Sequence, residues 1–258
     1  MREFSLGLWF RNRLFKVLKS HETTETLIGY ENPTLVNEIV KKTLIRSQQI
    51  KNGEPLEISE VRILLGMPSI DSPNLVVVDF GGGAGTHFDV FSSVYPEIDF
   101  HYFIIETPEM VRTASSNRSN DTNLYFLTLD ELDKLPGAID LLVANSSLQY
   151  SKSPIETLTT LCELAPKNLW ITRFPLNDKE DSITIQQLSK LEDNGPGRQR
   201  VVSNKFVEYE SNIVSIIEFE RELEKKFNVT MKVLEERNPY GSDYPSINSY
   251  GFLAKTKK

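Results

Sequence analysis

The chain has 258 residues, a formal net charge of −7 and a single cysteine. One cysteine excludes an internal disulfide framework and suits a reducing, cytoplasmic compartment. The three histidines lack the Cys/His spacing of a structural zinc site, so we expect no metal. The acidic charge argues against nucleic acid as a partner, and we find no apolar stretch long enough to cross a bilayer.

Residues 1–19 stand apart because basic and apolar side chains are interspersed there. Five basic residues against Glu3 give this segment a net charge of +4, whereas the rest of the chain is acidic. Such a segment can lie on an anionic membrane surface or contact a partner protein. It can also be an ordinary helix that packs its aromatic face on the main domain. We favour this second interpretation because the segment is short.

A helical cap is predicted before the first long strand. Asn32 and Pro33 form the residue pair that typically starts a helix. Apolar residues then recur on one face, namely Leu35, Val36, Ile39, Val40 and Leu44. We therefore divide the chain into an N-terminal helical segment, residues 1–70, and a second domain, residues 71–258.

The most informative segment is a strand that runs directly into a glycine cluster. Residues 75–78 are apolar and largely β-branched, as in a strand buried on both faces. Asp79 follows and opens the pattern Asp-x-Gly-x-Gly-x-Gly, which a predicted helix at residues 86–94 continues. Glycines let backbone N–H groups approach a ligand without obstruction, although a tight loop also explains them. The dinucleotide fingerprint fits poorly, because Thr86 stands where its third glycine belongs.

A second strand is predicted at residues 99–106, and it ends in an acid. A carboxylate at the end of this strand can accept both hydrogen bonds of a ribose diol. Glu106 occupies that position. Alone it is equally well explained as a solvated acid at a strand end, but its distance from the glycine cluster favours the ribose contact.

The remaining pattern alternates strands with helices. A helix is predicted to begin at Pro154, and an amphipathic helix is predicted at residues 213–227. Further strands are predicted at residues 123–127, 138–144, 168–172, 229–234 and 249–255. Polar residues follow several strand ends, and the carboxyl ends of parallel strands form the ligand-binding edge of an open α/β sheet. The loops at residues 193–197 and 238–249 are predicted to be mobile walls of that site.

The glycine motif resembles motif I of the class I S-adenosylmethionine-dependent methyltransferases. Four segments further resemble a group of methyltransferases often associated with bacterial O-antigen and surface polysaccharide clusters, namely residues 28–31, 78–88, 146–150 and 171–176. This resemblance implies an α/β, Rossmann-like fold with a seven-stranded, mostly parallel sheet. It also implies S-adenosylmethionine as the cofactor and a small-molecule acceptor, such as a sugar or nucleotide sugar.

The resemblance also implies which residues hold the cofactor. They lie in the glycine motif, at the end of the second strand, and after the third and fourth strands. The expected set is Asp79, Phe80, Gly81, Gly82, Gly83, Gly85, Glu106, Thr107, Thr128, Leu129, Asn145 and Ser146. Of these, Thr128 and Leu129 are expected beside the adenine.

Three residues are candidates for the acceptor side of the reaction. His87 follows the glycine loop, and a neutral imidazole suits a general base near pH 7. It can instead order the loop without taking part in chemistry. Tyr150 and Arg173 follow the fourth and fifth strands, where they can orient an acceptor, and the arginine suits a carboxylate or phosphate. Both also have structural explanations.

Two other classes of function remain open from the sequence. A nicotinamide-dependent oxidoreductase requires a third glycine at the position of Thr86 and a hydride-transfer site that we do not find. A non-catalytic protein with the methyltransferase fold would use the basic N-terminal segment as its interaction surface. The complete set of Asp79, glycines and Glu106 argues against loss of cofactor binding.

Overall fold

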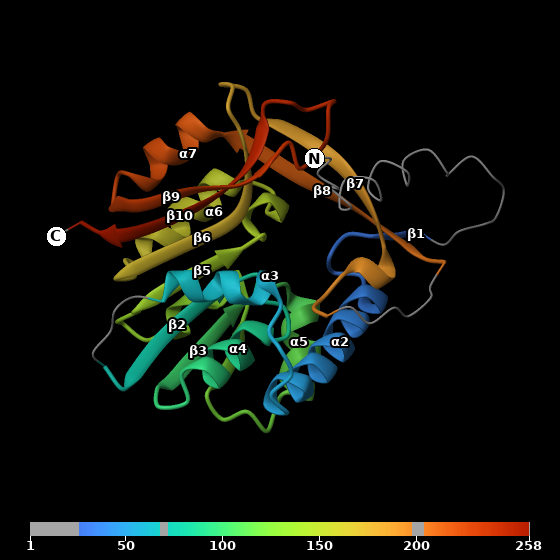
Figure 1. Ribbon diagram of the computed structural model, residues 1–258, viewed down its shortest axis with the longest axis vertical. Helices are drawn as coiled ribbons and strands as arrows, with labels where there is room; N and C mark the ends of the chain where they lie inside the picture. The colour runs from blue at the N-terminus through green and yellow to red at the C-terminus, as the bar shows by residue number, and fades with distance from the viewer. Residues whose placement is uncertain (1–25, 68–71, 198–203, 258) are drawn as a thin grey trace, which may run out of the picture.

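The computed structural model describes residues 26–67, 72–197 and 204–257 (Figure 1). The basic segment at residues 1–19, for which we favour a helix packed on the main domain, lies outside the described residues. Among those residues, no helix is long and apolar enough to cross a membrane.

A twisted sheet of seven strands forms the centre of the molecule. Its spatial order is β4–β3–β2–β5–β6–β10–β9, in which β2 to β6 are parallel and β10 runs antiparallel to both neighbours. This arrangement confirms the predicted seven-stranded, mostly parallel sheet. The strands are β2 (Asn74–Phe80), β3 (Asp99–Ile105), β4 (Leu124–Leu127), β5 (Leu141–Asn145), β6 (Asn168–Asn177), β9 (Phe227–Arg237) and β10 (Ile247–Thr256).

Helices cover both faces of this sheet, and β2 shows why. Its residues alternate between faces, so that Val77 packs with α4 (Thr86–Val94) and η1 (Arg62–Gly66) on one side. Val78 packs with α6 (Pro154–Glu163) and α7 (Ile216–Leu223) on the other side. Both cores exclude water, which accounts for the continuous apolar sequence of this strand. The remaining helices are α2 (Pro33–Lys51), α3 (Ile58–Val61), α5 (Pro108–Asn117), η2 (Leu129–Lys134), η3 (Leu148–Tyr150) and η4 (Leu191–Asp193).

Three strands were not predicted, and they extend the sheet beyond the end of β6. They are β1 (Thr26–Ile28), β7 (Ile183–Lys190) and β8 (Phe206–Ser215). The last residues of β8 pair with β6, while its first part pairs with β1 on one side and β7 on the other. The prediction of a helix at residues 213–227 was therefore wrong at both ends. Ile213 and Val214 belong to β8, and Ser215 caps α7 by accepting a hydrogen bond from the backbone of Ile217 (3.3 Å).

The cap helix α2 is joined to the central domain by a buried ionic network. Arg118, at the end of α5, donates two hydrogen bonds of 2.9 Å to the carboxylate of Asp89 on α4. Its Nε bonds Asp121 at 2.7 Å, and Ser47 of α2 donates to Asp89. The side chain of Arg118 is only 2% exposed. These bonds fix α2 against the start of the domain, and the proposed boundary near residue 70 stays a prediction.

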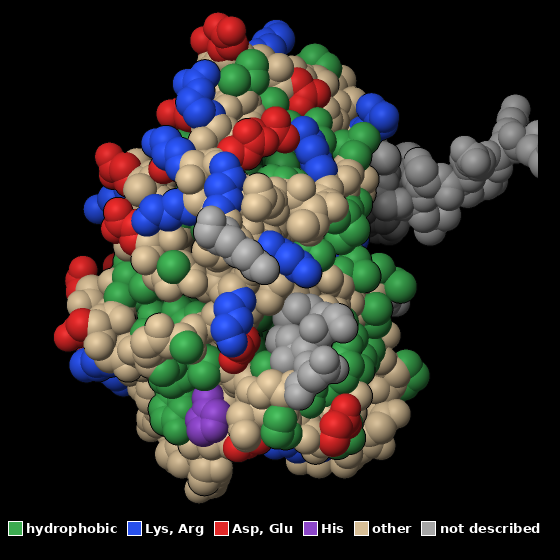
Figure 2. Space-filling view, turned by 90° about the vertical axis from the view of Figure 1, so that its left-hand side faces the viewer, with side chains coloured by type: hydrophobic (Ala, Val, Ile, Leu, Met, Phe, Trp, Pro, Cys, Tyr) green, Lys and Arg blue, Asp and Glu red, His purple; other side chains and the backbone are tan. Residues whose placement is uncertain are grey.

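The charges on the outer face of the molecule are mixed. Figure 2 shows lysine, arginine and acidic side chains intermingled over the upper part of this face. Pairs around α7 illustrate the mixing, such as Lys225 with Glu222 and Lys232 with Glu220, each at 2.5 Å. Exposed pairs of this kind contribute little to stability, so they serve mainly to keep the surface polar.

Candidate functional site

The glycine loop lies at the carboxyl end of β2 and needs its glycines for two different reasons. Gly81 has a φ of 73°, in the left-handed region, and a side chain there would collide with Ser147. Gly82 approaches the carboxylate of Asp79 so closely that a side chain would overlap it. The loop therefore packs tightly against its own surroundings, and the N–H groups of Gly81 and Gly83 bond Ile105 O (2.9 Å) and Glu106 Oε1 (3.0 Å).

The carboxylate of Asp79 organises the floor of this loop. It is fully buried, and its Oδ2 accepts hydrogen bonds from the Tyr102 hydroxyl (2.9 Å) and from Nδ1 of His87 (2.8 Å). The other ring nitrogen of His87 lies 3.1 Å from Nδ2 of Asn145. Because the amide nitrogen only donates, Nε2 accepts and the proton belongs on Nδ1. Asp79, His87 and Asn145 thus form one chain of hydrogen bonds from β2 through α4 to β5.

Glu106 lies where the sequence places it, directly after β3 and beside the glycine loop. Its Oε1 accepts a bond from the Gly83 N–H (3.0 Å), and its Oε2 accepts one from the Thr107 N–H (2.9 Å). Burial raises the pKa of this carboxyl, and the two backbone bonds partly oppose that shift. Each carboxylate oxygen retains a lone pair, so the group can still accept hydrogen bonds from a ligand.

The turn after β4 begins the helix η2. The backbone N–H and the hydroxyl of Thr128 both bond Oε2 of Glu131, at 2.9 and 3.2 Å. This is a capping box, with Thr128 as the N-cap of η2. Leu129 is 39% exposed and presents an apolar surface at the same turn. The adenine contacts of Thr128 and Leu129 stay predictions.

Several buried polar atoms around this edge have no hydrogen-bond partner among the described residues. They belong to side chains at the ends of β2, β3 and β5 and in η3, namely Asp79 Oδ1, Thr107 Oγ1, Asn145 Oδ1 and Gln149 Oε1. An unsatisfied buried polar group costs about 1–3 kcal/mol. Their concentration at the carboxyl edge of the sheet fits a site that a polar ligand completes.

Tyr150 lies in an aromatic cluster on the acceptor side of this edge. Its ring packs 4.8 Å from that of Tyr30 and 5.4 Å from that of Tyr209, measured between ring centroids. The Tyr30 hydroxyl is hydrogen-bonded to both neighbours. Burial, followed by the influence of these two neighbours, raises the pKa of Tyr30 well above its usual range. Tyr30 therefore supplies a neutral hydroxyl rather than a phenolate base.

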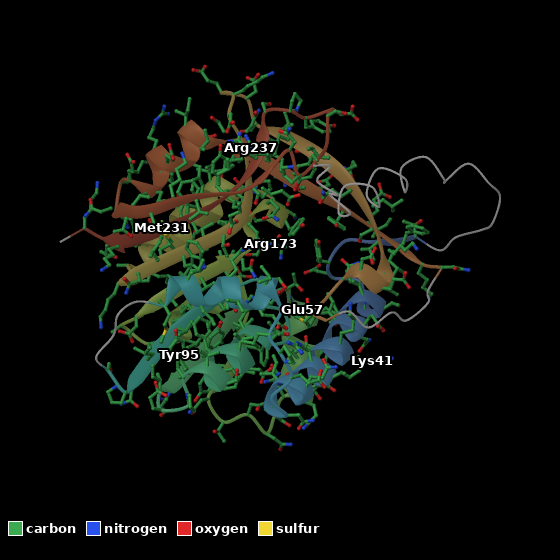
Figure 3. All side chains as sticks on the ribbon, in the orientation of Figure 1. Lys41, Glu57, Tyr95, Arg173, Met231 and Arg237 are labelled. Carbon is green, nitrogen blue, oxygen red and sulfur yellow. The ribbon has the colours of Figure 1, made fainter. Side chains whose placement is uncertain are left out.

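Arg173 is placed next to the cofactor edge by backbone pairing. Thr172 pairs with Asn145, and its carbonyl accepts the N–H of Ser146 at 2.9 Å. Arg173 is the next residue, and its φ of 54° is unusual for a residue other than glycine. Figure 3 shows Arg173 between the β6–β10 layer and the segment that carries Glu57. The structure thus brings His87, Tyr150 and Arg173 to the same end of the sheet, and their catalytic roles stay predictions.

Several residues of the site were missed by sequence reasoning. Ser147 donates a hydrogen bond of 2.6 Å to the carbonyl of Phe80 and so links the end of β5 to the glycine loop. Tyr102 holds Asp79, and Tyr209 completes the aromatic cluster from β8. Two members of the site carried a signal, because Ser147 and the cluster residue Tyr30 lie in segments that resemble the methyltransferase group, residues 146–150 and 28–31.

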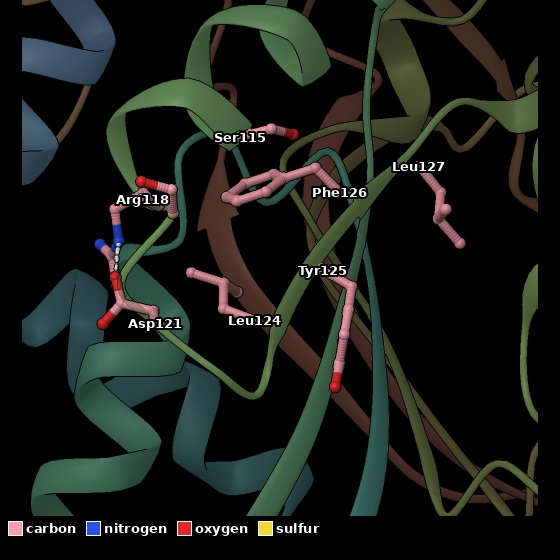
Figure 4. Close-up of a pocket in the computed structure, with 8 residues that line it drawn as sticks. Ser115, Arg118, Asp121, Leu124, Tyr125, Phe126 and Leu127 are labelled. Atoms are coloured by element: carbon pink, nitrogen blue, oxygen red, sulfur yellow. Dashed lines mark hydrogen bonds and ion pairs between the residues drawn. The ribbon is translucent and has the colours of Figure 1, made fainter.

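A separate pocket of about 260 Å³ lies between α5 and β4 (Figure 4). It is lined by residues such as Ser115, Leu124 and Phe126, with Arg118 and Asp121 at one side. The two charged side chains are bonded to each other at 2.7 Å. The pocket flanks β4 rather than the glycine loop, and we assign it no role. Within the described residues, no group of three or more His, Cys, Asp or Glu side chains is arranged to hold a metal.

Comparison with known proteins identifies the fold. No family model and no curated protein matches the chain. The geranyl diphosphate C-methyltransferase of Streptomyces coelicolor A3(2), solved with Mg²⁺, geranyl diphosphate and S-adenosylhomocysteine, aligns with a TM-score of 0.50 and 13% identity. The alignment covers 77% of this chain and 76% of that one. A geranyl diphosphate methyltransferase solved with sinefungin also gives 0.50, at 12% identity over 76% and 77% of the two chains.

A methyltransferase from Aquifex aeolicus aligns over 81% of this chain and 97% of that one, with a TM-score of 0.45 and 18% identity. The sheet order and the two neighbours at 0.50 show that the chain has the class I methyltransferase fold.

Proposed function

We propose that this protein is an S-adenosylmethionine-dependent methyltransferase that acts on a small molecule. The observation that carries the proposal is Glu106, whose carboxylate stands at the end of β3 and contacts the glycine loop through the Gly83 N–H. A carboxylate at this place suits a ribose diol, and the class I methyltransferase fold supports that assignment.

The residues present fit the cofactor in three respects. Gly83 has a left-handed φ and only Ile39 within 4 Å of a would-be Cβ, so the backbone beside Glu106 is open to a ligand. Glu106 supplies acceptor oxygens for ribose hydroxyls. The unpartnered oxygens of Asp79 and Asn145 and the Thr107 hydroxyl offer polar groups that a bound cofactor or its ordered waters would satisfy.

Methyl transfer asks the protein for alignment and for exclusion of water. When bound, S-adenosylmethionine supplies an electrophilic methyl group on a positively charged sulfur. The hydrogen-bonded chain of Asp79, His87 and Asn145 fixes one wall of the site. The tyrosine cluster forms a second wall, whose hydroxyls can orient an acceptor. His87 can take a proton from an acceptor hydroxyl only if its Nε2 exchanges the bond from Asn145 for the substrate.

For the acceptor we propose a sugar or nucleotide sugar of surface polysaccharide synthesis. This proposal rests on the resemblance of four segments to methyltransferases of such clusters, and the aromatic and hydroxyl-rich wall at Tyr150 is compatible with it. The cytoplasmic location expected from the single cysteine belongs to the same proposal.

The proposal is tested by titrating the Glu106→Ala variant with S-adenosylhomocysteine. Removing the carboxylate should weaken binding by about 1–3 kcal/mol, which is about 5- to 150-fold in the dissociation constant. Glu97→Ala, which alters an exposed acid in the loop before β3, is the matched control and should bind normally. Equal affinity of wild type and Glu106→Ala would contradict the ribose assignment.

A further inference from the structure

The backbone around Arg173 is distorted in a specific way. In the pairing of β6 with β10, Ile171 lies opposite Phe252 and Phe174 lies opposite Tyr250. Thr172 and Arg173 therefore face a single residue of β10, which defines a β-bulge. Bulges redirect side chains at the ends of strands, and the left-handed φ of Arg173 is part of this one.

A buried carboxylate from the next strand but one holds the bulge in place. Glu235 of β9 accepts hydrogen bonds from the Thr172 hydroxyl (2.6 Å) and from the backbone N–H of Arg173. Its side chain is 6% exposed. To reach β6 it must pass over β10 at Gly251, where a Cβ atom would lie 3.3 Å from Glu235 Oε1 and 2.9 Å from the Trp170 ring. The glycine thus leaves room for the carboxylate.

The same carboxylate also engages a second cation, Arg62, whose Nε lies 3.6 Å from Glu235 Oε1. By contrast, the guanidinium of Arg173 has no hydrogen bond or ion pair with any residue that the structure describes. The side chain of Arg173 reaches solvent, but the protein around it removes part of its hydration. This desolvation lowers the pKa of Arg173, and the nearby charge of Arg62 lowers it further. Tyr150 and the acids Glu235 and Glu236 act in the opposite direction. The buried carboxylate of Glu235 therefore pairs with Arg62 and with the backbone of Arg173, and the exposed Glu236 is the other acid near the Arg173 guanidinium.

We infer that the bulge presents Arg173, with Arg62 beside it, as a subsite for an oxyanion of the acceptor, either a phosphate or a carboxylate group. The inference rests on the proposed function, because it places this anion beside Tyr150, on the side of the sheet's carboxyl edge that we propose for the acceptor. A planar guanidinium with free donors binds such groups through paired hydrogen bonds.

The net charge of the whole chain means that an anionic acceptor would depend on a local cation. The chain carries a net charge of −7 and so repels an anionic acceptor over long distances. Tyr30 adds no negative charge there, because its raised pKa keeps its hydroxyl protonated. An anion beside Tyr150 therefore meets tyrosine hydroxyls and the guanidinium of Arg173, while the carboxylate of Glu235 is engaged by Arg62 and by the β6 bulge.

The test is calorimetric titration of the full chain, loaded with S-adenosylhomocysteine, with two probes: inorganic pyrophosphate and succinate. We expect saturable binding of at least one probe, and the preferred probe distinguishes a phosphate from a carboxylate subsite. In Arg173→Gln the dissociation constant should rise by about tenfold or more. Arg173→Lys keeps the charge but loses the paired hydrogen-bond geometry, so its affinity for the probe should fall between those of wild type and Arg173→Gln.

Arg221→Gln on α7 is the matched control, since it removes an exposed arginine away from this edge, and it should bind as wild type does. Titration with S-adenosylhomocysteine alone shows whether each variant keeps an intact cofactor half. Absence of probe binding in wild type, or equal affinity in Arg173→Gln, would overturn the subsite. Failure of wild type to bind S-adenosylhomocysteine would instead contradict the proposed function. In that case, titration of the free chain with the two probes still tests the anion subsite.

Discussion

The two halves of the carboxyl edge are built in different ways. The half that we propose for the cofactor, at the ends of β2 and β3, is formed largely by residues that lie close together in the sequence, from Asp79 to Glu106. The half that we propose for the acceptor joins Tyr30, Tyr150 and Tyr209 from distant segments. The first half is recognisable as a motif, whereas the second exists only once the chain has folded.

This difference suggests a separation of roles that variants can test. If the cofactor half is an autonomous cradle, changes within it should alter the affinity for S-adenosylhomocysteine. Changes in the acceptor half should leave that affinity intact. The following predictions run from the largest expected effect to the smallest.

The largest effect is expected at the ionic network that fixes α2 to the cofactor half. Arg118→Met leaves the carboxylate of Asp89 buried without its counter-charge, which should lower the free energy of unfolding by about 3–5 kcal/mol. Urea unfolding followed by circular dichroism measures the change. The control Arg112→Met removes a side chain that is 68% exposed and should cost less than about 1 kcal/mol. Similar losses in both variants would refute the network's importance.

A smaller effect is expected at His87, where two hypotheses diverge. Because the imidazole joins Asp79 to Asn145, His87→Ala should lower the free energy of unfolding by about 1–3 kcal/mol and weaken S-adenosylhomocysteine binding. A role as general base alone predicts slower methyl transfer with nearly normal cofactor affinity. Titration of this variant separates the two, with His101→Ala on β3 as the control, since its side chain is 43% exposed.

The smallest effect is expected in the acceptor half. Tyr30→Phe keeps the aromatic packing but removes a buried hydroxyl, which should cost about 0.5–1.5 kcal/mol at neutral pH. Its affinity for S-adenosylhomocysteine should match that of wild type. A clear loss of cofactor affinity would break the proposed separation between the halves.

The same variant has a signature at alkaline pH. The folded state holds the Tyr30 proton above the usual pKa of 10, whereas the unfolded state releases it there. Stability from this group is therefore complete below pH 10 and is lost as the pH rises further. In Tyr30→Phe the decline should be shallower by up to about 1.4 kcal/mol per pH unit. Tyr244→Phe, at a tyrosine that is 37% exposed, is the control.

The limits of prediction follow the same division. The helix at Thr86–Val94 and the start of α2 at Pro33 were correct to the residue, because caps, glycines and apolar periodicity are local signals. The end of β8 was missed, since Ile213 and Val214 were assigned to the amphipathic pattern that continues into α7. A short sequence window does not reveal that Ile213 would be buried in a strand.

The site shows this limit most clearly at Glu235. An acid in a strand near the end of the chain carries no motif, and its partners on β6 lie more than 60 positions away. The bulge in β6 and the space at Gly251 allow Glu235 to reach Thr172 and Arg173. The positions of Asp79 and Glu106, by contrast, could be predicted, because both residues lie at the carboxyl ends of neighbouring parallel strands.

The central claim is that the cradle of Asp79, the glycines and Glu106 binds S-adenosylmethionine. The most direct test is calorimetric titration of the full chain with S-adenosylhomocysteine, with NAD as the comparison ligand. We predict saturable binding of S-adenosylhomocysteine and none of NAD. Saturable binding of NAD, or of neither ligand, would contradict the account.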